Sequence, residues 1–413
     1  MGGGLMQLVA YGAQDIYLTG NPQITFFKVV YRRHTNFSME SIEQTINGSV
    51  GPSSRVTSTI SRNGDLVYRL FYEVVGDAAA GLAGTGGTVT SGTGGTANIG
   101  SAIFDNVEIE IGGQRIDRQT GQWMNVWASL CEENSARLRA DQFGKGGTLF
   151  QELTQMGGTV THASLVDHDS AGAGVIKVDC KVPLQFWFCR NPGLALPLIA
   201  LQYHEVKVVT SFSSLMVAGS GTKLWADYIY LDTDERRRFA QVSHEYLIEQ
   251  VQYQAGSSSS VSTELNFNHP VKELIWTGGA IGGVQTALDS TKDYQLKLNG
   301  HDRMSSRPLD YFTKQQVWMH HTGPGDLTPV GVDADARLLT SGANQPGVGS
   351  AGNGIAVYSF ALKPEEHQPS GTCNFSRIDN AQLIGPEQGR DVFAVNYNVL
   401  RIMSGMGGLA YSN

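Results

Sequence analysis

Two stretches of the chain, FCRNPGLALPLIALQYHEV at residues 188–206 and FALKPEEHQPSGTCNFSRI at residues 360–378, repeat one pattern of aromatic, proline and apolar positions. Five pairs of similar residues are separated by the same number of positions: Phe188 and Phe360, Pro192 and Pro364, Pro197 and Pro369, Tyr203 and Phe375, and Val206 and Ile378. Self-similarity at a constant spacing indicates that the chain contains an internal duplication.

Three further pairs of segments extend this pattern toward the N-terminus. The first pair is Ile42-Glu43-Gln44 and Ile248-Glu249-Gln250. In the second pair, Asn63, Leu66, Leu70 and Phe71 match Asn268, Val271, Ile275 and Trp276 in that order. The third pair is IEIGG, which ends at Gly113, and LKLNG, which ends at Gly300. Each match alone is short, but all four occur in the same order in both halves, and their separation only shrinks along the chain. Two copies of one fold produce this behaviour when the first copy carries the longer loops.

Most of the remaining sequence alternates apolar and polar residues in short runs, which is typical of strands. Examples are FDNVEIEIGG, VPLQFWF, YHEVKVVTSF, KLWADYIYLD, YLIEQVQYQ, YQLKLNG, IAVYSFAL and NYNVLRIM. Many short strands between glycine-rich turns indicate an all-β protein, and each copy is long enough for an eight-stranded sandwich with long loops. We therefore predict a double jelly roll, two consecutive eight-stranded antiparallel β-sandwiches over residues 39–235 and 236–413, with a few short helices.

The segment LTGNPQITFFKVVYRRHTNFS, residues 18–38, precedes the first repeat and has no counterpart before the second. Its apolar run is too short to span a membrane. Asn21 is a favourable helix N-cap and Pro22 suits the first helical position, so a short helix with an aromatic face is expected here. Residues 1–38 are therefore predicted to form an N-terminal arm outside the duplicated fold.

A second helix is expected from Gly121, in GQWMNVWASLCEENSARLRADQ, where tryptophan and leucine residues recur roughly at helical spacing. Two segments, Ala78–Ser101 and Gly323–Gly354, are rich in Gly, Thr, Ala and Ser. Structureless segments of this length in a folded chain usually carry a specific role. Both are predicted to be long loops on the outward surface.

The composition restricts the function. The 413-residue chain is 41 % apolar and only 16 % charged, against about 25 % charged in an average globular protein. A low charge content fits a surface that is partly buried against other copies of the chain. The formal net charge of −8 argues against a nucleic-acid-binding protein, which needs a basic face. Four cysteines without a CxxC pair predict thiols in a reducing compartment.

Three short motifs invite a catalytic or metal-binding interpretation, and each has a simpler alternative. Asp232-Thr233-Asp234 resembles the DxD of metal-dependent glycosyltransferases, but it follows a strand and precedes charged residues, so an inter-domain linker is favoured. Asp167-His168-Asp169 offers metal-ligand types, yet its Gly/Ser/Ala-rich context favours a polar loop. His320-His321 lacks the HExxH context of zinc enzymes, so surface or interface histidines are expected.

Other catalytic signatures are missing from the sequence. It contains no GxSxG elbow and no GxxxxGK[ST] phosphate loop. The six tryptophans could form a sugar-stacking platform, but Trp187, Trp225 and Trp276 sit within apolar strand-like runs, which favours core packing. We therefore predict no catalytic residue, no metal site and no cofactor.

Four longer segments carry a family resemblance: DIYLTGNPQITFFKVVYRRHTNFS, GLALPLIALQYHEVKV, QPSGTCNFSRIDNA and NYNVLRIMSGMGGLAY. They resemble the major capsid proteins of nucleocytoplasmic large DNA viruses, and especially those of the algal chloroviruses, a group of phycodnaviruses. The resemblance covers both ends and most strands, and it fades in the glycine-rich loops. It implies a double jelly roll, a homotrimer whose six jelly rolls form a pseudo-hexagonal capsomer, and an icosahedral shell of such capsomers over an internal lipid membrane.

The resemblance also implies N-linked glycans on outward loops, at asparagines outside the usual sequon. The candidates are Asn344, Asn98 and Asn353, with unmodified turn asparagines as the alternative. The three ordinary sequons, at Asn36, Asn47 and Asn374, are expected to stay unused because no secretory signal is visible.

The predicted function is a non-enzymatic capsid subunit of the virion, made in the host cytoplasm. Its expected partners are other copies of itself, neighbouring capsomers and minor capsid proteins, with the arm near the viral membrane and no direct nucleic-acid contact. Arg32, Arg33 and His34 of the arm are expected to face minor capsid proteins, lipid headgroups, or acidic residues of the same subunit. The alternatives are a lectin-like, carbohydrate-binding β-sandwich and a minor capsid or spike paralogue.

Overall fold

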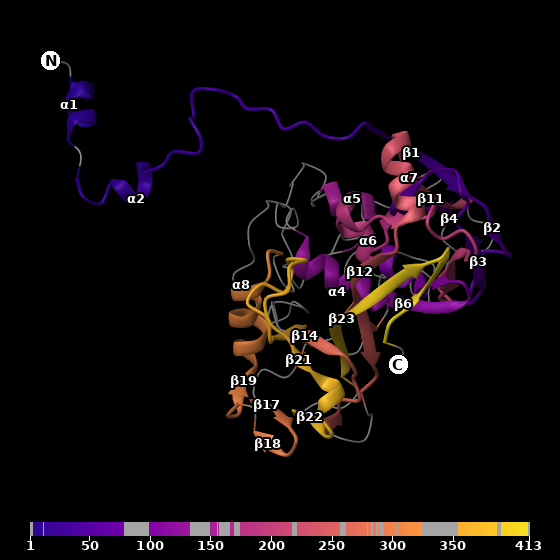
Figure 1. Ribbon diagram of the computed structural model, residues 1–413. Helices are drawn as coiled ribbons and strands as arrows, with labels where there is room; N and C mark the ends of the chain where they lie inside the picture. Colours follow the sequence, from indigo (N-terminus) through magenta and orange to yellow (C-terminus); the bar gives the residue numbers. More distant parts are fainter. Residues whose placement is uncertain are drawn as a thin grey trace. The chain divides into compact units, whose positions relative to one another are not determined.

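The computed structural model describes residues 3–10, 12–77, 99–132, 149–154, 156, 166–168, 174–216, 221–256, 262–278, 280–281, 284–285, 288, 293–302, 304–323, 354–385 and 390–411. The chain divides into two units, Met1–Asn36 and Phe37–Asn413. Within the residues that the structure describes, the larger unit has four multi-stranded antiparallel sheets, and Figure 1 shows their strands as arrows. They form two sandwiches, named here the first sandwich (β1 to β11) and the second sandwich (β12 to β24).

The first sandwich places a sheet of order β1-β11-β4-β8-β7 opposite one of order β2-β3-β10-β5-β6. The strands of the first sheet are β1 (Phe37–Gln44), β11 (Gly221–Leu231), β4 (Leu66–Asp77), β8 (Gly174–Pro183) and β7 (Val166–His168), and β9 (Leu196–Pro197) also pairs with β4. Those of the second sheet are β2 (Ile46–Asn47), β3 (Arg55–Thr59), β10 (Val206–Phe212), β5 (Phe104–Ile111) and β6 (Gln114–Thr120).

The second sandwich places a sheet of order β12-β23-β14-β20 opposite one of order β13-β22-β17-β18. The first contains β12 (His244–Gln254), β23 (Asp391–Met403), β14 (Pro270–Thr277) and β20 (Ile355–Ser359), with β21 (Cys373–Asn374) on β14 and β24 (Met406–Leu409) on β23. The other contains β13 (Ser262–Glu264), β22 (Ala381–Ile384), β17 (Asp293–Leu298) and β18 (His301–Asp302), with β19 (Arg307–Pro308) on β17. A separate ribbon pairs β15 (Ala280–Ile281) with β16 (Val284–Gln285).

The two sandwiches repeat one strand order, which confirms the double jelly roll. The path β1-β11-β4-β8 corresponds to β12-β23-β14-β20, and β3-β10-β5-β6 corresponds to β13-β22-β17-β18. The turn between β5 and β6 also recurs between β17 and β18: Gly112 and Gly113 have φ of 59° and 82°, and Asn299 and Gly300 have φ of 51° and 74°. Positive φ at both central residues is the signature of the type I′ hairpin, for which Gly and Asn are the suitable residues.

One residue match within the duplication does not hold in space. Leu66 of β4 pairs with Pro197, and Val271, its counterpart in β14, pairs with Cys373. The position equivalent to Pro197 is therefore Cys373 and not Pro369. Strand pairing fixes the register of Pro197 in β9, whereas Pro369 lies in the segment between β20 and β21 and matches Pro197 only in residue type.

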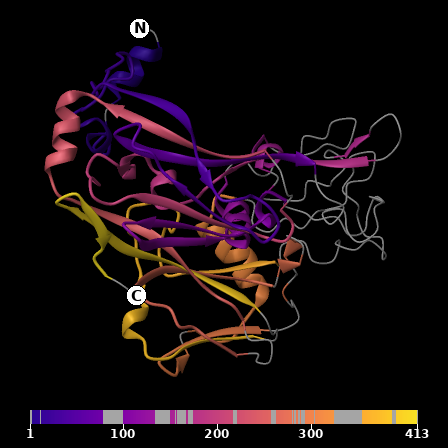
Figure 2. The ribbon, with the colours of Figure 1, turned by 90° about the vertical axis from the view of Figure 1, so that its right-hand side faces the viewer.

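Each sandwich has its own apolar core, because alternate residues of facing strands point inward. The first core is crossed by a hydrogen bond between the hydroxyls of Tyr72 in β4 and Thr210 in β10, at 2.7 Å. In the second core, the rings of Trp276 and Phe312 pack edge to face with their centroids 5.0 Å apart. Figure 2 shows the strands of the two sandwiches running alongside one another.

Short helices connect the strands. In the larger unit they are α3 (Ile99–Ala102), α4 (Gly121–Cys131), α5 (Leu149–Thr154), α6 (Trp187–Arg190), α7 (Thr233–Gln241) and α8 (Gln316–His320), with the single turns η2 (Pro192–Leu194), η3 (Tyr311–Gln315) and η4 (Phe375–Arg377). Helix α4 confirms the first half of the helix predicted from Gly121, and Thr120 caps it by accepting from the Trp123 N–H. The helix ends at Cys131, and residues 133–142 of the predicted segment lie outside the described residues. The run VPLQFWF is only partly a strand, because β8 ends at Pro183 and α6 begins at Trp187.

Helix α4 connects the first sandwich to the second. It follows β6, and its Trp123, Val126 and Leu130 join one buried apolar cluster with residues of β12, β14, β20 and β23. The Trp123 and Phe393 rings have centroids 5.4 Å apart. This helix therefore covers the face of the β12-β23-β14-β20 sheet that points away from the second core.

The N-terminal unit, Met1–Asn36, contains α1 (Gly3–Val9) and α2 (Ile16–Thr19). The helix predicted to start at Asn21 is wrong. Asn21 has a φ of 51°, and the residues after it form no helix. Local capping signals do not sustain a short helix whose apolar face is unpacked, and Phe27 in this segment is 98 % exposed.

Candidate functional site

The junction between the two sandwiches contains buried polar contacts that connect their edges. The Val251 N–H of β12 donates to Asp117 Oδ1 of β6 at 3.1 Å, and the Gln250 side-chain amide donates to the Ile116 carbonyl. Burial raises the pKa of the Asp117 carboxyl to about 6, although hydrogen bonds from Val251 and Gln119 act in the opposite direction. Asp117 therefore fixes the position of β12 at the cost of holding a carboxylate away from water.

A second contact across the junction is ionic. Glu249 of β12 lies 2.9 Å from Arg190 of α6 and 2.9 Å from Lys272 of β14. Burial acts to raise the pKa of Glu249, but the charges of Arg190 and Lys272 outweigh it, so that this pKa is lowered. The Lys272 side chain is only 2 % exposed, so the three groups form a paired, desolvated charge cluster.

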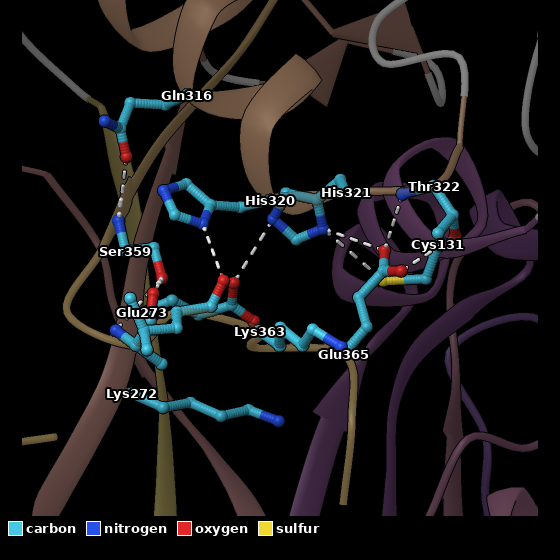
Figure 3. A network of polar contacts seen from close by, with 12 residues as sticks. Cys131, Lys272, Glu273, Gln316, His320, His321, Thr322, Ser359, Lys363 and Glu365 are labelled. Atoms are coloured by element: carbon cyan, nitrogen blue, oxygen red, sulfur yellow. Dashed lines mark hydrogen bonds and ion pairs between the residues drawn. The ribbon is translucent and has the colours of Figure 1, made fainter. Parts of the chain in front are cut away.

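A third cluster lies where α4, α8 and the segment after β20 meet (Figure 3). His321 follows α8 and is placed between two carboxylates, with Nε2 3.2 Å from Glu273 Oε2 and Nδ1 3.0 Å from Glu365 Oε1. Cys131 Sγ lies 3.9 Å from the same Nδ1. Burial acts to lower the pKa of His321, but Glu273, Cys131 and Glu365 together raise it well above its ordinary value of 6.5. The imidazole is therefore a buried cation held by two acids.

A cavity of about 550 Å³ lies beside these clusters. Its lining combines apolar side chains such as Trp127 and Ile275 with the polar groups of Arg190, Glu273 and Glu365. Residues of both sandwiches form it, so the junction is a polar, hollowed seam.

The structure corrects the interpretation of two sequence motifs. His321 was expected at a surface or interface, yet its side chain is fully buried because Glu273 and Glu365 compensate its charge; His320 beside it stays partly exposed. Asp167 and His168 were expected in a polar loop, but they lie in β7, which pairs with β8. Asp169 falls outside the described residues.

The remaining candidates differ in outcome. Asp232 ends the link from β11 and caps α7 by accepting from the Thr233 N–H at 2.8 Å, so the DxD motif is a helix start. Core packing is confirmed for Trp187 and Trp276, but it is wrong for Trp225, which is only half-buried and donates to Glu73. None of the four cysteines takes part in a disulfide. The proposed glycan sites Asn344, Asn98 and Asn353 lie outside the described residues.

The charged residues of the junction were missed by sequence reasoning. A signal for them exists in the run PVKELIWT, where Lys272 and Glu273 interrupt an apolar strand in the middle of a sheet. Charges in such a position need partners from elsewhere in the chain, which the sequence does not identify.

Large apolar side chains are also exposed on the larger unit. On α8, Trp318 is 82 % and Met319 is 52 % exposed, and Leu362 after β20 is 77 % exposed. The His320 ring contacts the Leu362 carbonyl at 3.3 Å, which places Leu362 beside this helix. We name Trp318, Met319 and Leu362 the α8 patch. Within the described part of the chain, no helix is long and apolar enough to cross a membrane.

The fold is that of double jelly-roll capsid proteins. The structure matches a crystal structure of PBCV-1 VP54, fitted into a reconstruction of the virophage Sputnik, with a TM-score of 0.69 and 34 % identity over 94 % of this chain and 100 % of the other. It also matches the Faustovirus major capsid protein with a TM-score of 0.56, at 12 % identity over 95 % of this chain and 94 % of the other. The second match supports the fold alone.

Sequence comparison gives the family. Residues 25–232 match the family model "Major capsid protein N-terminus", and residues 235–330 and 346–385 match "Large eukaryotic DNA virus major capsid protein". The major capsid proteins of Pyramimonas orientalis virus and Paramecium bursaria Chlorella virus 1 are 51 % and 39 % identical to the chain, each over the full length of both proteins. The chain belongs to the major capsid protein family of large eukaryotic DNA viruses.

Family membership decides the class of function. The protein is a structural component of the virion that builds the capsid and associates with itself in the capsid lattice. Membership of this family confirms the resemblance predicted from the sequence. It also favours a capsid subunit over a carbohydrate-binding protein and over an enzyme. The predicted minor capsid or spike paralogue remains an alternative to the principal shell protein.

Proposed function

We propose that the chain forms a homotrimer whose six jelly rolls make a pseudo-hexagonal capsomer. The observation that carries this proposal is the repeated strand order of the two sandwiches within one chain. Three copies around a threefold axis then present six similar sandwiches, which is the number that a hexagonal tile needs. Closed cyclic symmetry of this kind is the usual outcome for homo-oligomers.

The contact between copies is proposed to include the α8 patch. Exposed aromatic and methionine side chains are enriched in protein interfaces, and a large tryptophan is a frequent anchor in them. Trp318 is 82 % exposed although Val317, its neighbour, is buried in the chain's own core. A second copy of this chain is the proposed occupant, because a capsid lattice consists of repeated copies.

We further propose an assembly role for the N-terminal arm, residues 1–38, and boundaries of 39–235 and 236–413 for the two jelly rolls. The arm exposes Phe26, Phe27 and Tyr31 to 89 %, 98 % and 86 %, which leaves apolar area to be covered in the shell. Minor capsid proteins and the headgroups of an internal membrane are its proposed neighbours. Asn344, Asn98 and Asn353 remain the proposed glycan sites.

Light scattering and negative-stain electron microscopy of the purified protein test the capsomer. We expect a trimer at micromolar concentration and doughnut-like hexagonal particles. A monomer at that concentration, with no such particles, contradicts the proposal.

A further inference from the structure

A thiol, an imidazole and a carboxylate from separate segments meet at the junction of the two sandwiches. Cys131 is the last residue of α4, His321 follows α8, and Glu365 lies between β20 and β21. One ligand atom from each lies within 4.8 Å of the other two, and Figure 3 shows the three side chains turned toward one another. We propose that Cys131, His321 and Glu365 form a zinc-binding site that ties the first sandwich to the second.

The donor set is the first support for this proposal. Thiolate sulfur, imidazole nitrogen and carboxylate oxygen are the three protein ligand types of zinc, whereas magnesium and calcium prefer oxygen donors alone. Tetrahedral zinc separates its ligand atoms by roughly 3.3–3.6 Å, from metal–ligand distances of about 2.0–2.3 Å. The two distances to His321 Nδ1, 3.9 Å from Cys131 Sγ and 3.0 Å from Glu365 Oε1, bracket this range, so small side-chain shifts suffice.

The groups behind the ligands give the second support. Glu273 Oε2 lies 3.2 Å from His321 Nε2, on the side of the ring opposite the proposed metal, as in the carboxylate–histidine–zinc arrangement. Thr322 orients a second ligand, Glu365, because the N–H and the hydroxyl of Thr322 donate to the two carboxylate oxygens at 3.1 and 2.8 Å. Both ligands are thereby oriented before a metal arrives.

Space also fits. Cys131 and Glu365 line the junction cavity of about 550 Å³, which has room for a water molecule as the fourth ligand.

The sequence does not disclose this site, because its ligands are 190 and 44 positions apart. It contains none of the short ligand spacings by which zinc sites are usually recognised. Folding of both sandwiches and of the connecting helix is needed to bring the ligands together.

Titration with Co²⁺ tests the site in the full-length protein. Cobalt in a tetrahedral site with a thiolate ligand gives intense d–d bands and a sulfur-to-metal charge-transfer band. We expect these bands to saturate at one Co²⁺ per chain, to disappear on adding Zn²⁺, and to be lost in Cys131→Ser and reduced at least tenfold in affinity in Glu365→Gln. Cys131→Ser keeps a side chain of similar size and is expected to fold.

Two matched variants make the test specific. Cys373→Ser removes another partly exposed thiol, and His320→Gln removes the adjacent imidazole; both should leave the cobalt spectrum unchanged. The proposal is overturned if the wild type gives no charge-transfer band. It is also overturned if Cys131→Ser retains the band, or if Cys373→Ser abolishes it.

Discussion

Asp117 Oδ1 accepts a hydrogen bond from the Val251 N–H at 3.1 Å, and this contact helps to join the edge strand of one jelly roll to that of the other. The two residues are far apart in the sequence, and both are buried. The junction is thus built from polar as well as apolar contacts, and a polar contact needs a defined geometry. This geometry fixes how the two halves of a capsid subunit face each other.

The buried Asp117 carboxyl predicts a pH dependence of stability. Its pKa is about 6 in the folded protein against an ordinary value of 3.8, so the folded state binds this proton more tightly than the unfolded state. The ionised group therefore costs stability above pH 6, and the cost disappears as the pH falls toward 4. Each pKa unit corresponds to about 1.4 kcal/mol, which gives about 3 kcal/mol in total.

Replacement of Asp117 by Asn isolates this effect. Asn retains an oxygen for the Val251 N–H. The amide does not titrate, so any effect of the substitution itself on the free energy of unfolding is the same at every pH. We expect the unfolding free energy of the wild type to rise by about 2.5 kcal/mol relative to Asp117→Asn between pH 7 and pH 4, measured by urea denaturation. Asp105→Asn, which removes an exposed carboxylate of β5, is the control. Parallel profiles for wild type and Asp117→Asn would show that the prediction is wrong.

The Glu249 cluster predicts a large loss of stability on removal of one charge. In Glu249→Gln, Arg190 and the buried Lys272 lose their common counter-ion. An unpaired buried charge typically costs about 3–5 kcal/mol. We expect a loss of that size in the free energy of unfolding. Glu245→Gln in the same strand removes an exposed partner of Arg401 and should cost less than about 1 kcal/mol; equal losses would contradict the prediction.

Local sequence patterns account for most of the fold. The alternation of apolar and polar residues in FDNVEIEI and YLIEQVQYQ predicted β5 and β12. The polar residues in the middle of β12, such as Glu249 and Gln250, are nevertheless buried, because the first sandwich covers this part of the strand. The duplication was visible because corresponding strands keep similar residues, such as Leu70 and Ile275. Helix α4 was predicted from its tryptophan and leucine spacing. These features depend on neighbours in the sequence.

The rest depends on contacts between distant residues. The burial of His321 follows from Glu273 and Glu365, which are distant in the sequence. The helix expected at Asn21 had suitable local signals but does not form, and a helix this short is not stable from local signals alone. The charges of the junction and the ligands of the proposed zinc site were invisible for the same reason: only the folded chain brings them together.

The α8 patch predicts a variant that folds but does not assemble. Trp318 is 82 % exposed, so Trp318→Ser should change the free energy of unfolding of the isolated chain by no more than about 0.5 kcal/mol. If the patch lies between copies, loss of an interface tryptophan costs about 2 kcal/mol or more at each contact, and light scattering should show a shift from trimer to monomer. Val242→Ser, which removes another exposed apolar side chain, is the control. Trimers of undiminished stability in Trp318→Ser would place the subunit contact elsewhere.

Deletion of residues 1–36 separates folding from assembly. The cut leaves β1 whole, because β1 begins at Phe37 and pairs with β11 from its first residue. The arm forms a unit of its own, so the midpoint of urea unfolding should change little. The exposed aromatic side chains of the arm are then no longer available to contact other subunits, and we expect electron microscopy to show capsomers that assemble poorly into shells.

A shorter deletion, of residues 1–10, is the control. It keeps Phe26, Phe27 and Tyr31 and should assemble better than the full deletion. Normal shells from the chain lacking residues 1–36 would refute the assembly role of the arm, and loss of the unfolding transition would show that the arm is instead part of the fold.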